Sequence, residues 1–337
     1  MSDAVRSAVG KLAAGERPSS IEIGASFQAI LAGEAEPALI AAFLMGLRTR
    51  GETVDDIVAG VRVMRATMRP AKAPDGAVDT CGTGGLSWTS LNTSTAVALV
   101  AAGAGVVVAK HGNRSKSRAG SADVLEALGV NLAPTDAQIE ASFRDARVAF
   151  MFAQQHHTAM KHVAPVRQAL GMRTIFNMLG PLANPASVKR QVMGVFAPEW
   201  VEPIAHAMLA LGAERAMVVH GIDGMDEIST TGETLVADVK DGAVRVYRLT
   251  PEDIGVSRAN LDQLRGGTVA ENAEALKRAL GGEAGPFGDL VAVNAGAAIL
   301  VAGLAGTLAD GIAQARAAVG NGKAIAALEA LRRASNG

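Results

Sequence analysis

The sequence predicts an α/β protein in which a small N-terminal helical domain precedes a larger α/β domain with a mostly parallel central sheet. Three observations support this fold class. Residues up to about 68 show helical patterns only, a segment rich in Pro and Gly covers residues 70–76, and short apolar runs then alternate with helical patterns. Such alternation is typical of βαβ units, whose strands are parallel.

The N-terminal helices are predicted from their start signals. Ser19 precedes Glu22 by three positions and Thr53 precedes Asp56 in the same way, so both pairs resemble capping boxes. Pro37 suits the first turn of a helix, because its missing N–H is not needed there. An apolar stripe follows it, formed by Leu39, Ile40, Phe43, Leu44 and Leu47.

Strands of the larger domain are predicted where short apolar runs end at glycine or polar loops. These runs cover residues 77–80, 106–109, 148–152, 216–220 and 291–293. A hairpin is expected at Asp241-Gly242, between apolar runs at 236–239 and 244–247. Helices are expected over residues 122–128 and 160–170, and a break that could act as a hinge over residues 180–185.

The composition limits the classes of protein that the chain can represent. Of its 337 residues, 49% are hydrophobic and 19% charged, so we expect a large aliphatic core and little disorder. The formal net charge of -1 lacks the basic excess typical of nucleic-acid binders. The single cysteine, Cys81, excludes an internal disulfide and fits a reducing compartment. Because it precedes a glycine turn, we interpret it as a packing residue rather than a nucleophile.

The sequence favours a cytoplasmic protein without a membrane partner. Its first residues lack the basic-then-apolar pattern of a signal peptide. The uncharged stretch 290–309 approaches the length of about 20 residues that spans a bilayer. It contains Asn294, Thr307 and several glycines, so we interpret it as a buried strand and helix.

A glycine loop and a hydroxyl-rich helix start together indicate an anion site. Gly82-Thr83-Gly84-Gly85 follows the first predicted strand, and Asn92-Thr93-Ser94-Thr95 opens the next apolar helix. The glycines leave backbone N–H groups unobstructed, and a helix N-terminus adds partial positive charge. Such a loop alone is often only a turn, but its coupling to the helix start favours a highly phosphorylated ligand.

A basic segment and an acidic pair are further candidates. Lys110-His111-Gly112-Asn113-Arg114 follows the second strand, where open α/β sheets bind ligands, and it is either a diphosphate clamp or a solvated loop. Asp226-Glu227 is either a solvated pair or a Mg²⁺ site, because hard cations take oxygen donors and bridge carboxylate to phosphate.

Histidines and an arginine between these motifs allow more than one interpretation. His156, His157 and His162 lack the spacing of a zinc motif, which favours pocket lining or ordinary helix positions. Arg167 is either a surface charge or a forked donor for a carboxylate substrate.

Together these motifs resemble the anthranilate phosphoribosyltransferase family, which has the nucleoside-phosphorylase-like phosphoribosyltransferase fold. The resemblance covers nearly the whole chain and is carried by residues 42–45, 51–53, 82–85, 92–95, 110–114, 120–129, 157–167, 173–177, 180–182 and 226–227. It implies a small helical domain of residues 1–70, joined by a helical segment at about 165–188. The α/β domain that binds the phosphoribosyl donor would comprise residues 71–164 and 189–337, and the chain would form a homodimer through its helical domains.

The resemblance also implies an activity, which is transfer of the phosphoribosyl group of phosphoribosyl pyrophosphate to the amine of anthranilate, the second step of tryptophan biosynthesis from chorismate. The donor would contact Gly82, Gly85, Leu86, Ser90, Asn92, Thr93, Ser94, Thr95, Lys110 and Ser121. The cofactor Mg²⁺ would be held by Ser94, Asp226 and Glu227. Anthranilate would meet Gly82, Asn113 and Arg167, with its path shaped by His111, His157 and Pro181. Lys110 and Arg167 would have electrostatic and positioning roles.

Three positions depart from the family pattern. Leu86-Ser87 stand where Asp-Gly is common, the loop 115–119 is one residue short, and Thr158 stands where proline is common. These departures concern donor affinity and loop closure more than the reaction.

Two other functions compete with the transferase. A pyrimidine nucleoside phosphorylase shares the fold, but its phosphate signature and length are missing here. A noncatalytic nucleic-acid-binding relative would be expected to lose Asn113 and the acidic pair, and both are present.

Overall fold

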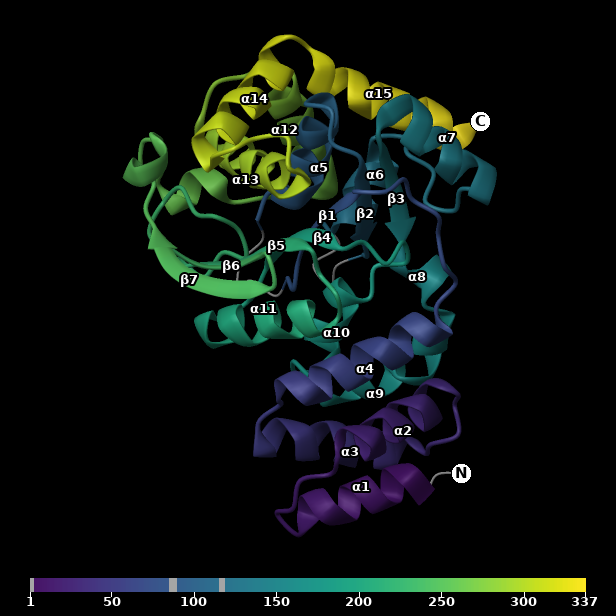
Figure 1. The fold of residues 1–337 in the computed structure, drawn as a ribbon. Helices are drawn as coiled ribbons and strands as arrows, with labels where there is room; N and C mark the ends of the chain where they lie inside the picture. The colour runs from purple at the N-terminus through teal and green to yellow at the C-terminus, as the bar shows by residue number, and fades with distance from the viewer. Residues whose placement is uncertain (1–2, 85–89, 115–118) are drawn as a thin grey trace.

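The computed structural model describes residues 3–84, 90–114 and 119–337, and a helical domain lies beneath a larger α/β domain in the view of Figure 1. The N-terminal helices are α1 (Asp3–Ala13), α2 (Ser20–Leu31), α3 (Pro37–Arg50) and α4 (Val54–Thr67). Both predicted capping boxes are confirmed, because Ser19 caps α2 with Glu22 and Thr53 caps α4 with Asp56. Pro37 lies in the first turn of α3, as predicted.

Seven strands within the described residues form one sheet in the order β3-β2-β1-β4-β5-β6-β7. The strands are β1 (Val78–Gly82), β2 (Val108–Gly112), β3 (Val148–Phe152), β4 (Arg190–Gly194), β5 (Arg215–Gly221), β6 (Thr234–Lys240) and β7 (Ala243–Leu249). The strands from β3 to β5 pair in parallel, whereas β6 and β7 are antiparallel, which confirms a mostly parallel sheet. The predicted hairpin joins β6 to β7, and both Asp241 and Gly242 have positive φ there.

Helices cover both faces of the sheet (Figure 1). On one face, α5 (Thr93–Gly103) packs on β1, β2 and β3, and α13 (Pro286–Ala302) packs on β1, β4 and β5. On the other face, α11 (Val201–Ala210) packs on β5, β6 and β7. The remaining helices are α6 (Ser121–Ala127), α7 (Asp136–Ala146), α8 (Ala153–His156), α9 (Ala164–Leu170), α10 (Phe176–Leu182), α12 (Val269–Leu280), α14 (Leu308–Gly320) and α15 (Lys323–Asn336), with 3₁₀ turns at Thr158–His162, Pro198–Trp200, Glu252–Ile254 and Leu261–Leu264.

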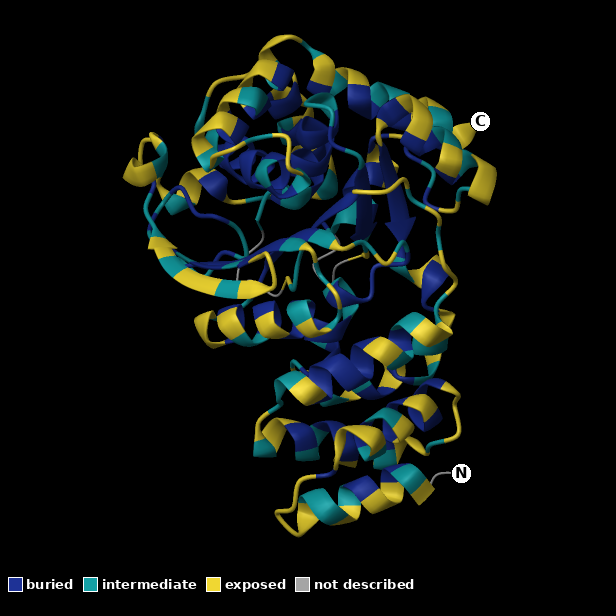
Figure 2. Cartoon of the chain, viewed as in Figure 1, coloured by how far each residue is buried: buried dark blue, intermediate teal, exposed yellow. Residues whose placement is uncertain are grey.

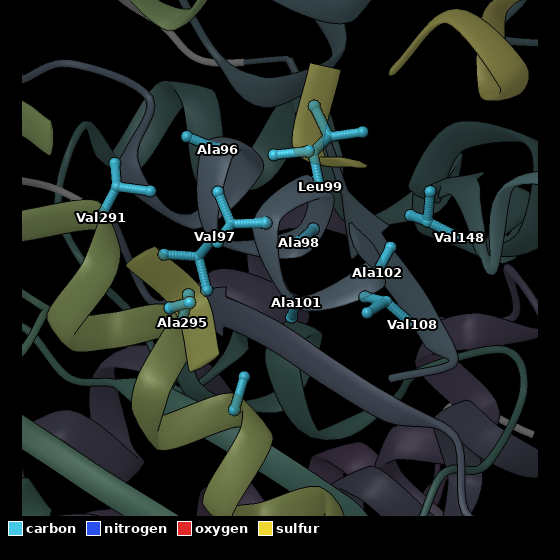
Figure 3. Packing of buried hydrophobic residues seen from close by; sticks show 14 of the residues in the cluster. Ala96, Val97, Ala98, Leu99, Ala101, Ala102, Val108, Val148, Val291 and Ala295 are labelled. Atoms are coloured by element: carbon cyan, nitrogen blue, oxygen red, sulfur yellow. The ribbon is translucent and has the colours of Figure 1, made fainter. Parts of the chain in front are cut away.

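The core follows the two-residue period of the strands. Met217 and Val219 of β5 belong to the cluster with α5 and α13, whereas Ala216 and Val218 belong to the cluster with α11 and the N-terminal helices. Figure 3 shows small side chains of α5 beside Ala295 of α13. In Figure 2 the inner strands are coloured as buried, while the edge strand β7 is largely exposed.

The segment that carries α9 and α10 packs against the N-terminal helices. Helix α9 contacts α3, and α10 contacts α4. The ring of Phe27 lies edge-on to that of Phe43 at 5.4 Å and to that of Phe176 at 5.6 Å. Arg65 donates two hydrogen bonds to the carbonyl of Leu182, of 2.8 and 3.1 Å. Helix α10 therefore shares a core with α2, α3 and α4.

Several predicted elements are wrong. The structure places residues 291–293 inside helix α13 rather than in a strand, and strand β4 was not predicted. Pro181 lies within α10, so the break predicted for 180–185 begins only after Leu182. The predicted helix 160–170 divides into a 3₁₀ turn and α9, and the second strand begins at Val108.

The uncharged stretch 290–309 consists of most of α13, a loop and the start of α14, rather than a strand and a helix. Across the described ranges, no helix combines the length and the apolar character needed to cross a bilayer.

Phe27→Ala should lower the free energy of unfolding by about 3–5 kcal/mol, because it removes a fully buried ring that joins α2 to α3 and α10. Ile21→Ala on the same helix is the control, since Ile21 is 84% exposed. Urea unfolding measures both, and an equal effect of the two substitutions would contradict this packing.

Candidate active site

The candidate site lies at the carboxyl edge of the parallel strands. The glycine loop follows β1, His111 and Asn113 lie at the end of β2, and the acidic pair follows β5. Because β2, β1, β4 and β5 are parallel neighbours, these ends meet at one edge. The structure thus brings together the glycine loop, the helix start, Lys110 and the acidic pair, which the sequence placed apart.

Lys110 is a buried cation beneath the start of helix α5. Its side chain is 2% exposed, and its ammonium donates to the carbonyl of Thr80 at 2.7 Å and to Ser94 Oγ at 3.2 Å. Burial lowers the pKa of Lys110, while the nearby Asp79 carboxyl opposes that shift. Arg114, by contrast, is paired with Asp123 and Glu126 of α6. The two cations predicted to bracket a diphosphate therefore have different surroundings.

Asp79 begins the segment that runs into the glycine loop, but no role was predicted for its side chain. It is fully buried, accepts the His111 N–H at 3.1 Å and accepts Asn184 Nδ2 at 2.8 Å. Burial raises the pKa of Asp79 to about 6, although Lys110 opposes the shift. An acidic residue inside a strand was the available signal, because a buried carboxyl group requires polar partners.

The acidic loop approaches the sheet closely because glycines face it. Asp226 Oδ2 accepts the Gly84 N–H at 2.8 Å. A Cβ on Gly82 would lie 2.1 Å from Asp226 Oδ2, and a Cβ on Gly194 would lie 1.6 Å from the Asp226 carbonyl oxygen. Gly194 ends β4, the strand that was not predicted, so its role was missed as well. Any side chain at these two positions would push the acidic loop away.

A cavity of about 20 Å³ lies between the acidic pair and helix α5. Ser94, Asp226 and Glu227 line it, together with Asn294 and apolar residues. Glu227 Oε2 is shielded from solvent and has no hydrogen-bond partner among the described residues. Burial raises the pKa of Glu227 well above its usual value, and the Asp226 carboxyl adds to the shift. A space of this size, surrounded by three oxygen-bearing side chains, fits a hard divalent cation. One of the oxygens has no hydrogen-bond partner among the described residues.

The side chain before helix α5 bonds to neighbouring segments rather than to the helix. Asn92 does not cap α5 with its side chain, and it donates instead to the Ala119 carbonyl at 2.9 Å. Asn272 of α12 donates to Asn92 Oδ1 at 3.0 Å and to the Ser90 carbonyl at 3.3 Å. The hydroxyl of Thr95 is buried without a hydrogen-bond partner in the described part of the chain. No described side chain caps this helix start, although the Thr93 and Thr95 N–H groups donate to the Leu91 and Asn92 carbonyls, so an anion would be attracted mainly by the helix dipole.

Two buried histidines lie side by side near the site. The ring centroids of His111 and His157 are 5.1 Å apart, and the Nε2 atoms of both are buried with no partner that the described residues supply. Burial lowers the pKa of His157 to about 4 and that of His111 well below its usual value. Both imidazoles are therefore neutral near pH 7.

The other histidines do not join this pair. His156 Nδ1 lies 2.8 Å from the Arg69 carbonyl oxygen, and His162 packs against Gly33. Among the described residues, no group of three or more His, Cys, Asp or Glu side chains is arranged to hold a metal ion.

The remaining predicted residues lie on other elements. Arg167, on α9, is 5.7 Å from the ring centroid of Phe176 and 3.4 Å from Asn177 Oδ1. Asn113 follows β2, and the Pro181 carbonyl accepts Gln191 Nε2 at 2.9 Å. Ser121 is the first residue of α6. Gly85, Leu86, Ser87 and most of the loop 115–119 lie outside the described residues.

Cys81 has the surroundings of a packing residue. Its Sγ atom accepts Gln191 Nε2 at 3.1 Å, and burial raises the pKa of the thiol well above its usual value. A thiol with a raised pKa is a poor nucleophile, in agreement with the interpretation from sequence.

Comparison with known families identifies the class of protein. Residues 74–325 match the family model described as "Glycosyl transferase family, a/b domain", and residues 6–68 match "Glycosyl transferase family, helical bundle domain". The chain is thus a glycosyltransferase with a helical bundle and an α/β domain.

Individual relatives narrow the family. The chain is 53% identical to the anthranilate phosphoribosyltransferase of Parvibaculum lavamentivorans, over 98% of this chain and 97% of that protein, and 53% identical to that of Caulobacter vibrioides, over 100% and 98%. The crystal structure of the Thermus thermophilus enzyme superposes with a TM-score of 0.92 at 45% identity, over 98% of this chain and 99% of that one. The chain belongs to the anthranilate phosphoribosyltransferase family, which confirms the resemblance inferred from its motifs.

A more distant structure shares the fold. The Saccharomyces cerevisiae enzyme, crystallised in complex with PRPP and Mg, superposes with a TM-score of 0.90 at 24% identity, over 100% of this chain and 99% of that one.

Gly194→Ala should displace the acidic loop, because the new methyl group would overlap the Asp226 carbonyl. We expect a loss of about 2 kcal/mol of stability and a large loss of activity. Gly24→Ala is the control, since a Cβ on Gly24 meets nothing within 4 Å. Thermal unfolding and turnover measure both variants, and a fully active Gly194→Ala enzyme would refute the close approach.

His157 should make stability depend on pH. Its pKa is 6.5 in the ordinary case and about 4 in the folded protein, so the unfolded chain binds more protons between these values and stability falls as the pH falls. Between about pH 7 and about pH 4.5, this group should account for a loss of about 2 kcal/mol. His157→Gln should flatten that slope in urea unfolding, whereas His206→Gln, on an exposed side chain, should leave it unchanged.

Proposed function

We propose that this protein transfers the phosphoribosyl group of phosphoribosyl pyrophosphate to the amine of anthranilate, giving N-(5-phosphoribosyl)anthranilate and pyrophosphate. This is the second step of tryptophan biosynthesis from chorismate. The observation that carries the proposal is the 53% identity to anthranilate phosphoribosyltransferases over nearly the whole chain. The site supports it, because a cation-sized cavity, a buried ammonium and the start of helix α5 lie together at the carboxyl edge of the sheet.

The donor is assigned to the edge formed by β1, β2 and α5. The first turn of α5 would face the pyrophosphate and attract it through the partial positive charge of the helix. The Thr83 and Gly84 N–H groups of the glycine loop already donate to the Gly194 carbonyl and to Asp226. Lys110 adds a full positive charge beneath Ser94. The remaining donor contacts are Gly85, Leu86, Ser90, Asn92, Thr93, Thr95 and Ser121, with Gly82 between donor and acceptor.

Ser94, Asp226 and Glu227 are assigned as the residues that would hold Mg²⁺. Their shared cavity and the orphaned Glu227 oxygen support this assignment. When bound, the cation would neutralise negative charge that develops on the departing pyrophosphate. The yeast protein of the same fold was crystallised with PRPP and Mg, which agrees with this choice of cofactor.

The acceptor is assigned to the side of the site that carries Asn113, Arg167, His111, His157 and Pro181. The forked guanidinium of Arg167 is suited to a carboxylate, and it has no carboxylate partner among the described residues' ion pairs. The two imidazoles are neutral, so they would shape the path of the acceptor without adding charge to it. An aromatic amine is an unprotonated nucleophile near pH 7, and positioning it in line with the ribose carbon supplies much of the rate.

The domain division, the assembly and the compartment complete the proposal. We assign residues 1–70 and about 165–188 to the small domain, because α9 and α10 pack on α3 and α4. A homodimer through that domain and a cytoplasmic location follow from the family resemblance.

The combined change Asp226→Asn and Glu227→Gln should lower kcat/KM by about 100-fold or more, because the developing charge loses its stabilising cation. Anthranilate fluorescence, followed with and without donor and Mg²⁺, measures the reaction. Glu214→Gln, an exposed acidic residue paired with Lys189, is the matched control.

The controls separate two failures. If the unaltered protein consumes no anthranilate with donor and Mg²⁺, the proposed function is wrong. If it does and the double variant retains full turnover, only the metal assignment is wrong.

A further inference from the structure

Helix α13 carries a buried polar side chain that packing alone does not explain. The helix is apolar through most of its length and covers the sheet beside the site. Asn294 lies in its middle and is only 4% exposed. Burial of an amide in such a core is unfavourable unless its hydrogen-bonding groups find partners. The partners of Asn294 therefore indicate why it is there.

Those partners are the backbone groups of the residue that follows the acidic pair. Asn294 Oδ1 accepts the Ile228 N–H at 2.8 Å, and Asn294 Nδ2 donates to the Ile228 carbonyl at 2.9 Å. The same Nδ2 donates to the Leu290 carbonyl at 2.9 Å, which fixes the amide against its own helix. One side chain thus holds both backbone groups of Ile228, next to Glu227.

A second set of hydrogen bonds holds the loop from the other side. Asp223 accepts the Met225 N–H at 2.9 Å and accepts the hydroxyls of Ser229 and Thr231. Asp226 and Glu227 therefore lie between two fixed points, one at Asp223 and one at Ile228. Asn294 also lines the cavity that the two carboxylates share.

We propose that Asn294 is a positioning residue that clamps the backbone at Ile228 and so holds the Asp226 and Glu227 carboxylates ready for a divalent cation bound to a diphosphate. The inference rests on the proposed function for the identity of that ligand. A loop without this anchor would sample many arrangements of the two carboxyl groups, few of which place both at one cavity. The clamp keeps both at one cavity before the ligand arrives, which removes an ordering cost from binding.

The test compares Asn294→Leu with Asn131→Leu. Leucine keeps the approximate size of the side chain but cannot hold Ile228. Asn131 is the matched control, because its amide also joins two backbone segments, accepting the Ala133 N–H and donating to the Ser335 carbonyl at the far end of the domain. Asn294→Ser is a second variant, since its short hydroxyl cannot reach both groups of Ile228 and is a milder change if the leucine variant does not fold.

Two measurements report on the clamp. Hydrogen exchange without any ligand should be about tenfold faster across residues 221–231 in the Asn294 variants. Binding of Mn²⁺ with inorganic pyrophosphate, followed by electron paramagnetic resonance, should weaken about tenfold. Asn131→Leu should change neither measurement, even if it lowers the melting temperature as much as Asn294→Leu does.

The outcomes separate the inference from the function on which it rests. If the Asn294 variants exchange and bind Mn²⁺ with pyrophosphate as the unaltered protein does, the clamp is refuted. If the unaltered protein binds no Mn²⁺ with pyrophosphate, the metal assignment fails, and hydrogen exchange alone decides whether Asn294 holds the loop. If Asn131→Leu speeds hydrogen exchange across residues 221–231 equally, the effect reflects a general loss of stability, and the inference is also refuted.

Discussion

The compensation of charge at the carboxyl edge of the sheet is the constraint on which the rest of this structure depends. One buried ammonium, that of Lys110, lies near the carboxyl groups of Asp79 and Glu227, and Asp226 stands beside Glu227. Burial raises the pKa of all three carboxyl groups. The positive charge near them is too small to cancel this effect. A cation bound in the cavity would stabilise the ionised form of these carboxyl groups and lower their pKa values. A site with this balance is suited to a cation that arrives with an anionic ligand.

Holding such charges in place requires close backbone approach and many polar contacts, and the sequence supplies both with small residues and amides. Gly82 and Gly194 have no side chain where Asp226 reaches the sheet. Three amides each donate to a backbone carbonyl near the site: Asn184 to Ala109 in strand β2, Asn272 to Ser90 and Asn294 to Ile228. Amides serve here because they donate and accept at once without adding charge to a region already crowded with it.

The sequence predicted those parts of the fold that depend on local chemistry. Capping boxes at Ser19 and Thr53, the hairpin at Asp241-Gly242 and the apolar strands depend on neighbouring residues. Helix α13 was mistaken for a strand in part because it is buried all round, so its apolar residues show no helical period. Strand β4 begins with Arg190 and Gln191, so only three of its residues are apolar or glycine and its sequence resembles a loop.

The same division applies to the candidate site. The glycine loop, Lys110 and the acidic pair were found because each is a recognisable run of residues, and the family resemblance connected them. The roles of Asp79, Gly194 and Asn294 were missed because they depend on contacts between distant segments. The Asp226 carbonyl beside Gly194 and the Ile228 backbone beside Asn294 have no trace in local sequence.

The alignment of the two proposed substrates depends on contacts between the sheet and the helices that pack on the small domain. Most of the proposed donor residues belong to β1, β2 and α5, whereas Arg167 and Pro181 belong to α9 and α10, which share a core with the N-terminal helices. Two amides join these parts, since Gln191 of β4 donates to the Pro181 carbonyl and Asn184 donates to Asp79. Asp79 in turn accepts the His111 N–H, so the segment after α10 is connected to the edge of β2 through one buried carboxyl group. Because in-line attack tolerates little misplacement, these hydrogen bonds are expected to fix the position of the proposed acceptor residues relative to the proposed donor residues.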